Sequence, residues 1–244
     1  MKYAVQMYSL RGQISGGDDM LDILGKVKEI GYDGVEFAGF AGLDAKTLKA
    51  RLDELGLVCV GAHVGLGDLE ADKLGATLDA AEILGMPQIG IGGADTSTEE
   101  ALSHVVAVMG EAEKEAEKRG MKIYFHTHTG EFVPPEGAAV PGTIIERIMG
   151  ACYAQIDTYW SFHAGIDTNA FLAEHRDRLV TVHLKDGNDG TPAALGEGQN
   201  DVPSIIACCE KLGIEWGVVE NDDPVPDGLS DITRSMAFLN KLKS

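Results

Sequence analysis

The sequence is poor in basic residues and lacks the signals of several common protein classes. Its 244 residues include 20 Lys and Arg against 39 Asp and Glu, a formal net charge of −19. A surface this acidic repels phosphate backbones, so we expect no nucleic-acid partner. No apolar run reaches the length of a bilayer span, so we expect no membrane segment. The N-terminal stretch lacks the regions of a signal peptide, which predicts a cytoplasmic protein.

Cysteine is scarce, and a glycine-rich nucleotide loop is missing. Cys59, Cys152, Cys208 and Cys209 form no C-x-x-C pair, so we predict four reduced structural thiols. The stretch RGQISGGDD after the first predicted strand contains no G-x-G-x-x-G. A dinucleotide-binding sheet usually carries that loop at this point. Its absence counts against an open doubly wound sheet, the main alternative among α/β folds.

One unit of organisation recurs along the chain: a helical stretch, then glycine, then a short apolar strand. It recurs as VKEIGYDGVEF, LDELGLVCVGA, AEILGMPQIGI, AEKRGMKIYF and CEKLGIEWGVV. The glycines stand where a helix needs a left-handed residue to end; they are Gly31, Gly56, Gly85, Gly120 and Gly213. The strands are near-continuous apolar runs, which is typical of a parallel sheet covered by helices.

Eight strands are predicted, near residues 3–10, 34–39, 58–64, 88–93, 122–128, 152–157, 179–186 and 217–221. The best-defined helix spans 99–119, with a capping box predicted at 96–99. Its apolar stripe consists of Leu102, Val105, Met109, Ala112 and Ala116. Eight such units in a chain of this length predict one α/β domain over residues 1–244, a (β/α)8 TIM barrel. The loops 129–142 and 187–202 are predicted to lie over its active-site face.

Titratable side chains gather at the carboxyl ends of the predicted strands, which meet at one mouth in a barrel. Asp157, His183 and Glu220 each end a strand that is otherwise core, and ionised carboxylates are costly to bury without a partner. With His126 they make a nitrogen and oxygen set suited to one divalent cation, Mn²⁺, Mg²⁺, Co²⁺ or Zn²⁺. The alternative is that each carboxylate pairs separately with Arg or Lys.

Four further residues are predicted to line a substrate pocket at this mouth: Arg11, Glu36, His63 and Trp160. For Glu36 the alternative is a salt bridge with Arg11. For His63 the alternatives are a hydrogen-bonded core histidine and a ligand of a second metal ion. Trp160 is predicted to form an apolar wall of the pocket, with plain core packing as its alternative.

Seven segments in order resemble a known family. VQMYSLR, GYDGVEFAGFAGL, YFHTH…EF, QIDTYW…AGID, VHLKD, LGEG and VVEND are together similar to the xylose isomerase-like sugar isomerase and epimerase barrels, also called the AP endonuclease family 2 superfamily. The resemblance spans essentially the whole chain, and the ordered set is specific although no single motif is decisive. It implies one divalent cation at the mouth, held by Asp157, His183 and Glu220 from strands six, seven and eight.

The resemblance is incomplete at strand five. Many members supply a glutamate ligand there, whereas this sequence has His126, followed by Thr127. Epimerases of the superfamily use two opposed glutamates, from strands five and eight, as their acid/base pair. This chain resembles a branch with histidine at that position, which puts a simple two-glutamate epimerase in question.

The predicted function is a metal-dependent isomerase or epimerase of a small sugar or sugar derivative, by proton abstraction next to a carbonyl. Glu220 is the leading base, and His128, Glu131 and Lys185 are the alternatives for the second acid/base; Lys185 is also predicted as a substrate contact. A metal-dependent lyase or dehydratase acting on a keto-sugar or keto-glycoside shares the first step. An abasic-site endonuclease and a non-catalytic sugar-binding barrel are the alternatives from other classes. Phosphorylation of the sugar and homo-oligomerisation stay open.

Overall fold

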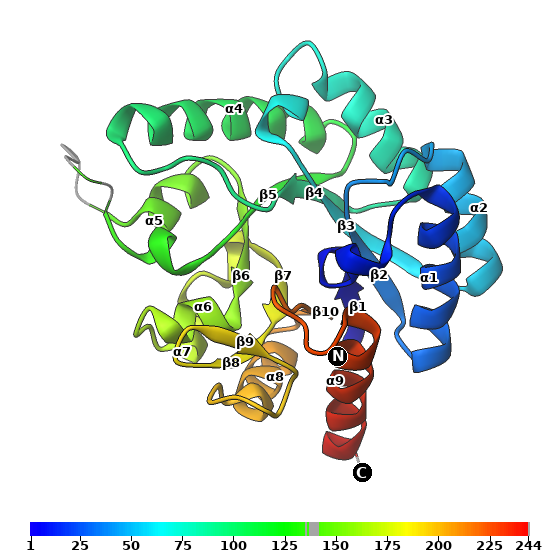
Figure 1. Cartoon of the computed structure of the whole chain (residues 1–244). Coiled ribbons are helices and arrows are strands. Elements are labelled where there is room, and N and C mark those ends of the chain that lie inside the picture. The colour runs from blue at the N-terminus through cyan, green and yellow to red at the C-terminus, as the bar shows by residue number, and fades with distance from the viewer. Residues whose placement is uncertain (135, 137–141, 244) are drawn as a thin grey trace.

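The computed structural model describes residues 1–134, 136 and 142–243. Eight parallel strands close into a barrel in the order β1-β10-β7-β6-β5-β4-β3-β2, with helices arranged around it (Figure 1). The strands are β1 (Lys2–Gln6), β2 (Gly34–Ala38), β3 (Val58–Val64), β4 (Gln88–Ile91), β5 (Lys122–His126), β6 (Tyr153–Asp157), β7 (Leu179–Leu184) and β10 (Trp216–Val219). The predicted TIM barrel is confirmed.

Helices α1 to α9 form the outer layer of the barrel. They are α1 (Gly17–Ile30), α2 (Ala45–Leu55), α3 (Leu74–Leu84), α4 (Glu99–Glu117), α5 (Ile144–Met149), α6 (Thr158–His163), α7 (Thr168–Glu174), α8 (Val202–Lys211) and α9 (Gly228–Leu242). The 3₁₀ turns are η1 (Met7–Gln13), η2 (Leu66–Asp68), η3 (Thr129–Phe132) and η4 (Arg176–Arg178). All five predicted helix-ending glycines have a positive φ, between 62° and 109°, as a left-handed helix end requires.

Two local predictions are wrong. The first strand ends at Gln6 rather than near residue 10, because the Gln6 side chain accepts a hydrogen bond from the Tyr8 N–H and begins η1. The predicted capping box at 96–99 is absent: α4 begins at Glu99, and Thr98 Oγ1 caps it by accepting the Ala101 N–H at 3.2 Å. The predicted apolar stripe of α4 is buried throughout.

The two predicted mouth loops have different outcomes. The loop 187–202 contains a structured element that the sequence did not indicate, an antiparallel hairpin of β8 (Asp186–Asn188) and β9 (Thr191–Ala193). The loop 129–142 begins with η3, and part of it lies outside the described residues. All four cysteines are free, as predicted. None of the helices in the described part of the chain combines the length and hydropathy that a membrane crossing requires.

Alternate residues of each strand face the helices and the lumen. The helix-facing positions are buried and apolar, among them Val5, Val35, Ile89, Ile123, Ile156, Val182 and Val219. The lumen has an apolar floor of Ala4, Val60 and Val218, with Trp216 packed against it. Above that floor lies a buried polar layer of Gln6, Glu36, Tyr124, Gln155 and Thr181. On β5, β6 and β7, the site residues His126, Asp157 and His183 lie two positions beyond Tyr124, Gln155 and Thr181.

Candidate metal centre

Four predicted ligands meet at the carboxyl ends of adjacent strands. His126, Asp157, His183 and Glu220 each offer one ligand atom, and these four atoms all lie within 4.8 Å of one another. His126 Nε2 is 3.8 Å from Asp157 Oδ2 and 3.9 Å from Glu220 Oε2. Every member of this cluster is at most 5 % exposed. The barrel closure therefore brings together two imidazoles and two carboxylates from β5, β6, β7 and the end of β10.

The donor set fits a divalent cation. Ligand atoms lie about 2.0–2.3 Å from such an ion, so two ligands across it are separated by about 4.0–4.6 Å, in keeping with the 4.8 Å span of this cluster. Asp157 Oδ1 accepts the Tyr159 and Trp160 N–H groups at 2.9 Å each. Asp157 Oδ2 is fully buried, and among the described residues it accepts no hydrogen bond beyond its ion pair with the Lys185 ammonium at 2.9 Å, which makes it the Asp157 oxygen suited to a cation.

Lys185 places a buried ammonium group beside this cluster. Its Nζ lies 2.9 Å from Asp157 Oδ2, 2.8 Å from Glu220 Oε2 and 2.7 Å from Asp222 Oδ2. Burial alone would lower the Lys185 pKa, but these three carboxylates outweigh it and raise the pKa well above its ordinary value. Lys185 therefore carries a proton and acts as the counter-charge of the carboxylates.

His183 bridges two carboxylates. Its Nδ1 lies 2.8 Å from Glu220 Oε2 and its Nε2 lies 2.6 Å from Glu36 Oε2. Burial alone would lower the His183 pKa, but the charges of Glu220 and Glu36 and their hydrogen bonds raise it to about 10. Burial would likewise raise the Glu220 pKa, but Lys185 and His183 hold it well below its usual range. Glu220 is therefore ionised.

Glu36 lies deeper in the lumen than the cluster and is fully buried. Its Oε1 accepts hydrogen bonds from Tyr124 Oη and Gln155 Nε2, and its Oε2 accepts one from Gln6 Nε2. The Glu36 pKa falls to about 2, since the charges of His63 and His183 and the hydrogen bonds to the carboxylate outweigh burial. Glu36 is thus brought beside the cluster, and its partners are lumen groups instead of Arg11.

His63 and Gln155 connect this polar layer to the cluster. Gln155 Oε1 lies 2.9 Å from His63 Nε2 and 3.1 Å from His126 Nδ1. His63, His126 and His183 also form a second group whose ligand atoms lie within 4.8 Å of one another. His63 therefore touches the site, and the geometry is compatible with both the core-histidine and the second-metal alternatives.

His128 and Glu131 lie at the rim in η3 and the residue before it. The Glu131 carboxylate accepts the His128 backbone N–H at 2.7 Å, and so caps this 3₁₀ turn. The His128 ring stands edge-on to His126, with ring centroids 4.8 Å apart. His128 therefore contacts a member of the cluster through its ring, whereas the Glu131 carboxylate is engaged with the backbone.

Trp160 lies beside Lys185, and Arg11 contacts Asp222, which pairs with Lys185. The Lys185 ammonium lies 5.5 Å from the centroid of the Trp160 ring, a cation–π distance. The Arg11 guanidinium donates to the backbone oxygens of Tyr8 and Asp222 and stacks 4.0 Å above the Tyr8 ring. The structure thus places Trp160 beside the cluster, and Arg11 at the exposed rim above Asp222.

Asp186, directly after Lys185, anchors the loop beyond β7. Its carboxylate accepts the N–H groups of Gly187, Gly196, Gly198 and Asn200 at 2.9–3.0 Å. A Cβ on Gly198 would lie 2.2 Å from Asp186 Oδ1, so only glycine permits this approach. The VHLKD and LGEG segments are therefore joined through Asp186, which the sequence did not single out.

Sequence reasoning also missed the polar layer under the cluster. Tyr124, Gln155 and Thr181 each stand two positions before a ligand, on the same face of the strand: Tyr124 before His126, Gln155 before Asp157, Thr181 before His183. A polar residue two positions before a strand-end ligand was the available signal, because residues i and i+2 of a strand face the same side.

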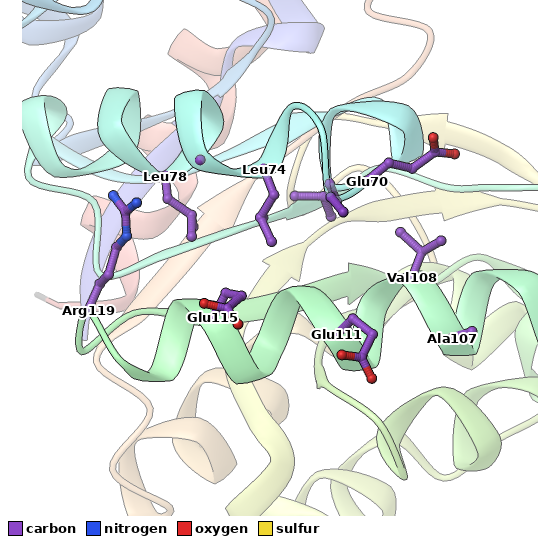
Figure 2. A pocket seen from close by; sticks show the side chains of 11 residues that line it. Glu70, Leu74, Leu78, Ala107, Val108, Glu111, Glu115 and Arg119 are labelled. Carbon is purple, nitrogen blue, oxygen red and sulfur yellow. The ribbon is translucent and has the colours of Figure 1, made fainter.

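A cavity of about 640 Å³ lies outside the barrel, between α3 and α4. Leu74 and Leu78 from α3 face Val108, Glu111 and Glu115 from α4 across it (Figure 2). Glu111 and Glu115 are paired with Lys114 and Lys118 at 2.6 Å. None of the predicted site residues lines this cavity, so it is separate from the mouth.

The closed barrel and the His/carboxylate cluster at its mouth define a class, the TIM-barrel proteins with a cluster able to bind a metal ion. The family of the chain follows from its sequence: the Xylose isomerase-like TIM barrel family matches residues 24–242. The chain belongs to this family. The resemblance seen in the sequence motifs is confirmed. A comparison with curated proteins finds no match.

Three solved structures illustrate the shared fold. A sugar phosphate isomerase/epimerase from Parabacteroides distasonis has a TM-score of 0.81 at 20% identity, covering 99% of this chain and 98% of its own. The probable 3-DHS dehydratase AsbF from Bacillus anthracis has a TM-score of 0.76 at 14% identity, covering 98% and 99%. A D-allulose 3-epimerase from Methylomonas sp. has a TM-score of 0.72 at 15% identity, covering 99% and 98%.

Proposed function

We propose that this protein is a divalent-metal-dependent isomerase or epimerase that abstracts a proton next to the carbonyl of a small sugar or sugar derivative. The observation that carries the proposal is the cluster of His126, Asp157, His183 and Glu220, whose ligand atoms lie within 4.8 Å of one another. The solved relatives named as isomerases and epimerases support the substrate class. The substrate enters from the mouth, where Arg11 and Trp160 flank the cluster.

His126, Asp157, His183 and Glu220 would hold the cation, with Mn²⁺, Mg²⁺, Co²⁺ and Zn²⁺ all compatible with two nitrogen and two oxygen donors. When bound, the ion would polarise the substrate carbonyl and offset the negative charge that develops on it. The protein's own groups perform the remaining steps. Their roles follow from which of them are ionised and which face the mouth.

Glu220 is the proposed base. Its carboxylate is ionised, since Lys185 and His183 hold its pKa well below the usual range against the effect of burial. Lys185 is the proposed acid or oxygen contact, because its protonated ammonium lies within 3 Å of Asp157, Glu220 and Asp222 and can donate to a developing alkoxide. His128 is the second proton carrier at the rim. Glu131 remains the third choice, because its carboxylate already accepts the His128 backbone N–H.

Elimination is the second candidate reaction. The specific observation in its favour is His126, which stands at the strand-five end where a two-glutamate epimerase needs its second carboxylate. A lyase or dehydratase needs one base and one acid at the departing oxygen, which Glu220 and Lys185 supply. The solved relative named as a probable dehydratase is consistent with this chemistry on the same fold.

The proposal also covers the domain organisation, the partners and the location of the protein. We propose a single domain over residues 1–244, a small-molecule substrate, no nucleic-acid partner and a cytoplasmic location. The net charge of −19 is what argues against the abasic-site endonuclease, since DNA binding depends on neutralising phosphates. The cluster itself argues against a non-catalytic sugar-binding barrel, because buried acid groups around a cation site have little use in sugar binding alone.

The test is a metal-supplemented screen of keto- and aldo-sugars in deuterated water, with NMR detection of exchange at the carbon beside the carbonyl. We expect exchange with at least one sugar, and loss of exchange and of metal binding in Asp157→Asn and His183→Ala. The control is His104→Ala, on the exposed face of α4. Full activity in a folded Asp157→Asn protein, or activity without any metal, would contradict the proposal.

A further inference from the structure

The Glu36 carboxylate is surrounded by hydrogen-bond donors from four other residues. Four donors converge on its two oxygens: Tyr124 and Gln155 on Oε1, and Gln6 and His183 on Oε2, all at 2.6–2.7 Å. Gln6 and Gln155 can only donate here, because Gln6 Oε1 accepts the Tyr8 N–H and Gln155 Nε2 also donates to Thr181 Oγ1. Each carboxylate oxygen therefore accepts an amide N–H, and Glu36 acts as an acceptor on both sides. This fact fixes the orientation of each partner.

The bond to Glu36 orients the His183 ring. Its Nε2 is 2.6 Å from Glu36 Oε2, so Nε2 carries the hydrogen of that bond. The other ring nitrogen, Nδ1, lies on the side of the cluster, 2.8 Å from Glu220 Oε2. Nδ1 is therefore the nitrogen that faces the cluster: in the metal-free protein it donates its hydrogen to Glu220, and a bound cation would take the place of that hydrogen.

The bond to Glu36 also orients the Gln155 amide. Its Nε2 donates to Glu36 Oε1 at 2.7 Å and to Thr181 Oγ1 at 2.8 Å, so its amide cannot be turned round. Gln155 Oε1 is then the group that faces His126 Nδ1 at 3.1 Å, and that nitrogen must carry a hydrogen. His126 Nε2 is left without one and points at Asp157 and Glu220.

We infer that Glu36 is a positioning residue: directly at His183, and through Gln155 at His126, it fixes the hydrogen on the ring nitrogen that faces away from the cluster. This inference rests on the proposed metal-dependent function and deepens it. Imidazole ligands usually donate their second N–H to a carboxylate or carbonyl, and loss of that partner typically weakens metal binding 10–100-fold. Here one carboxylate from β2 serves two imidazoles from β5 and β7.

The decisive variant is Glu36→Gln. The two sides of the carboxylate each receive two donors, so an amide NH₂ at either position must face donors instead of acceptors. We expect the affinity for Mn²⁺ or Co²⁺, measured by isothermal titration calorimetry, to fall 10–100-fold. We also expect the Co²⁺ absorption bands to change, because the imidazole geometry around the ion is no longer held.

A second readout needs no metal. In the metal-free protein, a long-range ¹H–¹⁵N spectrum shows which nitrogen of a neutral imidazole carries the hydrogen. His126 Nδ1 faces the acceptor Gln155 Oε1 at 3.1 Å, whereas the carboxylate oxygens nearest its Nε2 are 3.8 and 3.9 Å away. We expect its hydrogen on Nδ1 in the wild type, and a mixture or the Nε2 form in Glu36→Gln.

Two further variants separate positioning from general damage. Tyr124→Phe removes one donor to Glu36 but leaves the carboxylate accepting from His183 and Gln155, so we expect the wild-type spectrum and near-wild-type metal affinity. Gln155→Leu keeps Glu36 beside His183 and removes the amide that links Glu36 to His126. Of the two imidazole ligands we therefore expect only His126 to lose its Nδ1 hydrogen, and metal affinity to fall less than in Glu36→Gln. This variant also decides the relay if Glu36→Gln does not fold.

Each outcome supports or overturns the inference. A wild-type His126 with its hydrogen on Nε2, or a folded Glu36→Gln protein with an unchanged spectrum and unchanged affinity, overturns it. A fall as large in Tyr124→Phe as in Glu36→Gln overturns it too, because the damage would then be general. If the wild type binds no metal, the proposed function fails, while the metal-free spectra still decide whether Glu36 sets the His126 hydrogen.

Discussion

Neighbouring residues of one strand meet two different environments in this barrel. On β7, Val182 packs into the layer between strands and helices, while Thr181 and His183 face the lumen. All three are almost completely buried, so burial alone does not distinguish them. The helix-facing side is held by apolar packing, and the lumen by directed hydrogen bonds and paired charges. The same strand therefore carries stability on one face and chemistry on the other.

Two buried carboxylates, one in the lumen and one on a helix, have pKa values shifted in opposite directions. Glu36 in the lumen has its pKa lowered to about 2, because imidazole charges and donated hydrogen bonds outweigh burial. Asp231 on α9 is 1% exposed, and burial raises its pKa to about 6, against a hydrogen bond from Asn221 and the charge of Arg234, whose Nη2 lies 3.5 Å away. Equal burial gives opposite shifts, so it is the partners that decide whether a buried carboxylate is ionised.

The largest expected effect comes from removing the counter-charge of the lumen. Lys185→Met leaves Asp157, Glu220 and Asp222 without their shared ammonium, and breaking a buried ion pair in this way costs about 3–5 kcal/mol. Chemical denaturation of the metal-free protein measures it. The matched control, Lys211→Met on the exposed face of α8, should change the free energy of unfolding by less than about 0.5 kcal/mol. A similar small change in Lys185→Met would show that the lumen charges are not coupled.

On the helix-facing side the expected effect is on stability alone. Ile123→Ala removes a fully buried side chain of β5 and should lower the free energy of unfolding by about 3 kcal/mol through lost packing. Metal affinity of the folded variant, measured by calorimetry, should equal that of the wild type. A variant that lost metal binding while folded would break the proposed separation of the two faces.

The third prediction concerns pH and uses Asp231. Its folded-state pKa of about 6 lies above its ordinary value of about 3.9, so between these values the folded protein binds more protons than the unfolded chain. Stability from this group is present at low pH and is lost as pH rises through about 6. The loss is at most about 3 kcal/mol. Unfolding of Asp231→Asn measured at pH 4.5 and pH 7.5 should lack this decrease; an identical pH profile in both proteins would contradict the assignment.

The smallest expected effect lies in the polar layer. Thr181→Val keeps the shape of the side chain but removes the oxygen that accepts from Gln155 Nε2 at 2.8 Å. One buried hydrogen bond is worth about 1 kcal/mol. The free energy of unfolding, obtained from thermal unfolding curves, should therefore fall by about 1 kcal/mol. Because Glu36 still holds the Gln155 amide, metal affinity should stay unchanged. A loss of metal binding here would place Thr181 in the positioning network as well.

Much of the fold could be predicted from the sequence, because the signals are local. Gly56 and Gly85 mark helix ends, and the apolar strands between them have boundaries within a few residues of the prediction. The end of β1 was misplaced, since the side chain that ends it, Gln6, has no recognisable capping pattern in an apolar strand. The hairpin β8–β9 was missed because its strands are three residues long.

The sequence by itself determined which side chains stand at the ends of the strands, because strand length and the two-residue period are set by neighbouring residues. Only the tertiary structure decided which of them meet. Glu36 reaches His183 across 147 positions and Gln155 across 119, and no local pattern encodes such a pairing. The physical reason is closure: the lumen joins strands that are distant in sequence, and a buried carboxylate must find its donors wherever the barrel brings them.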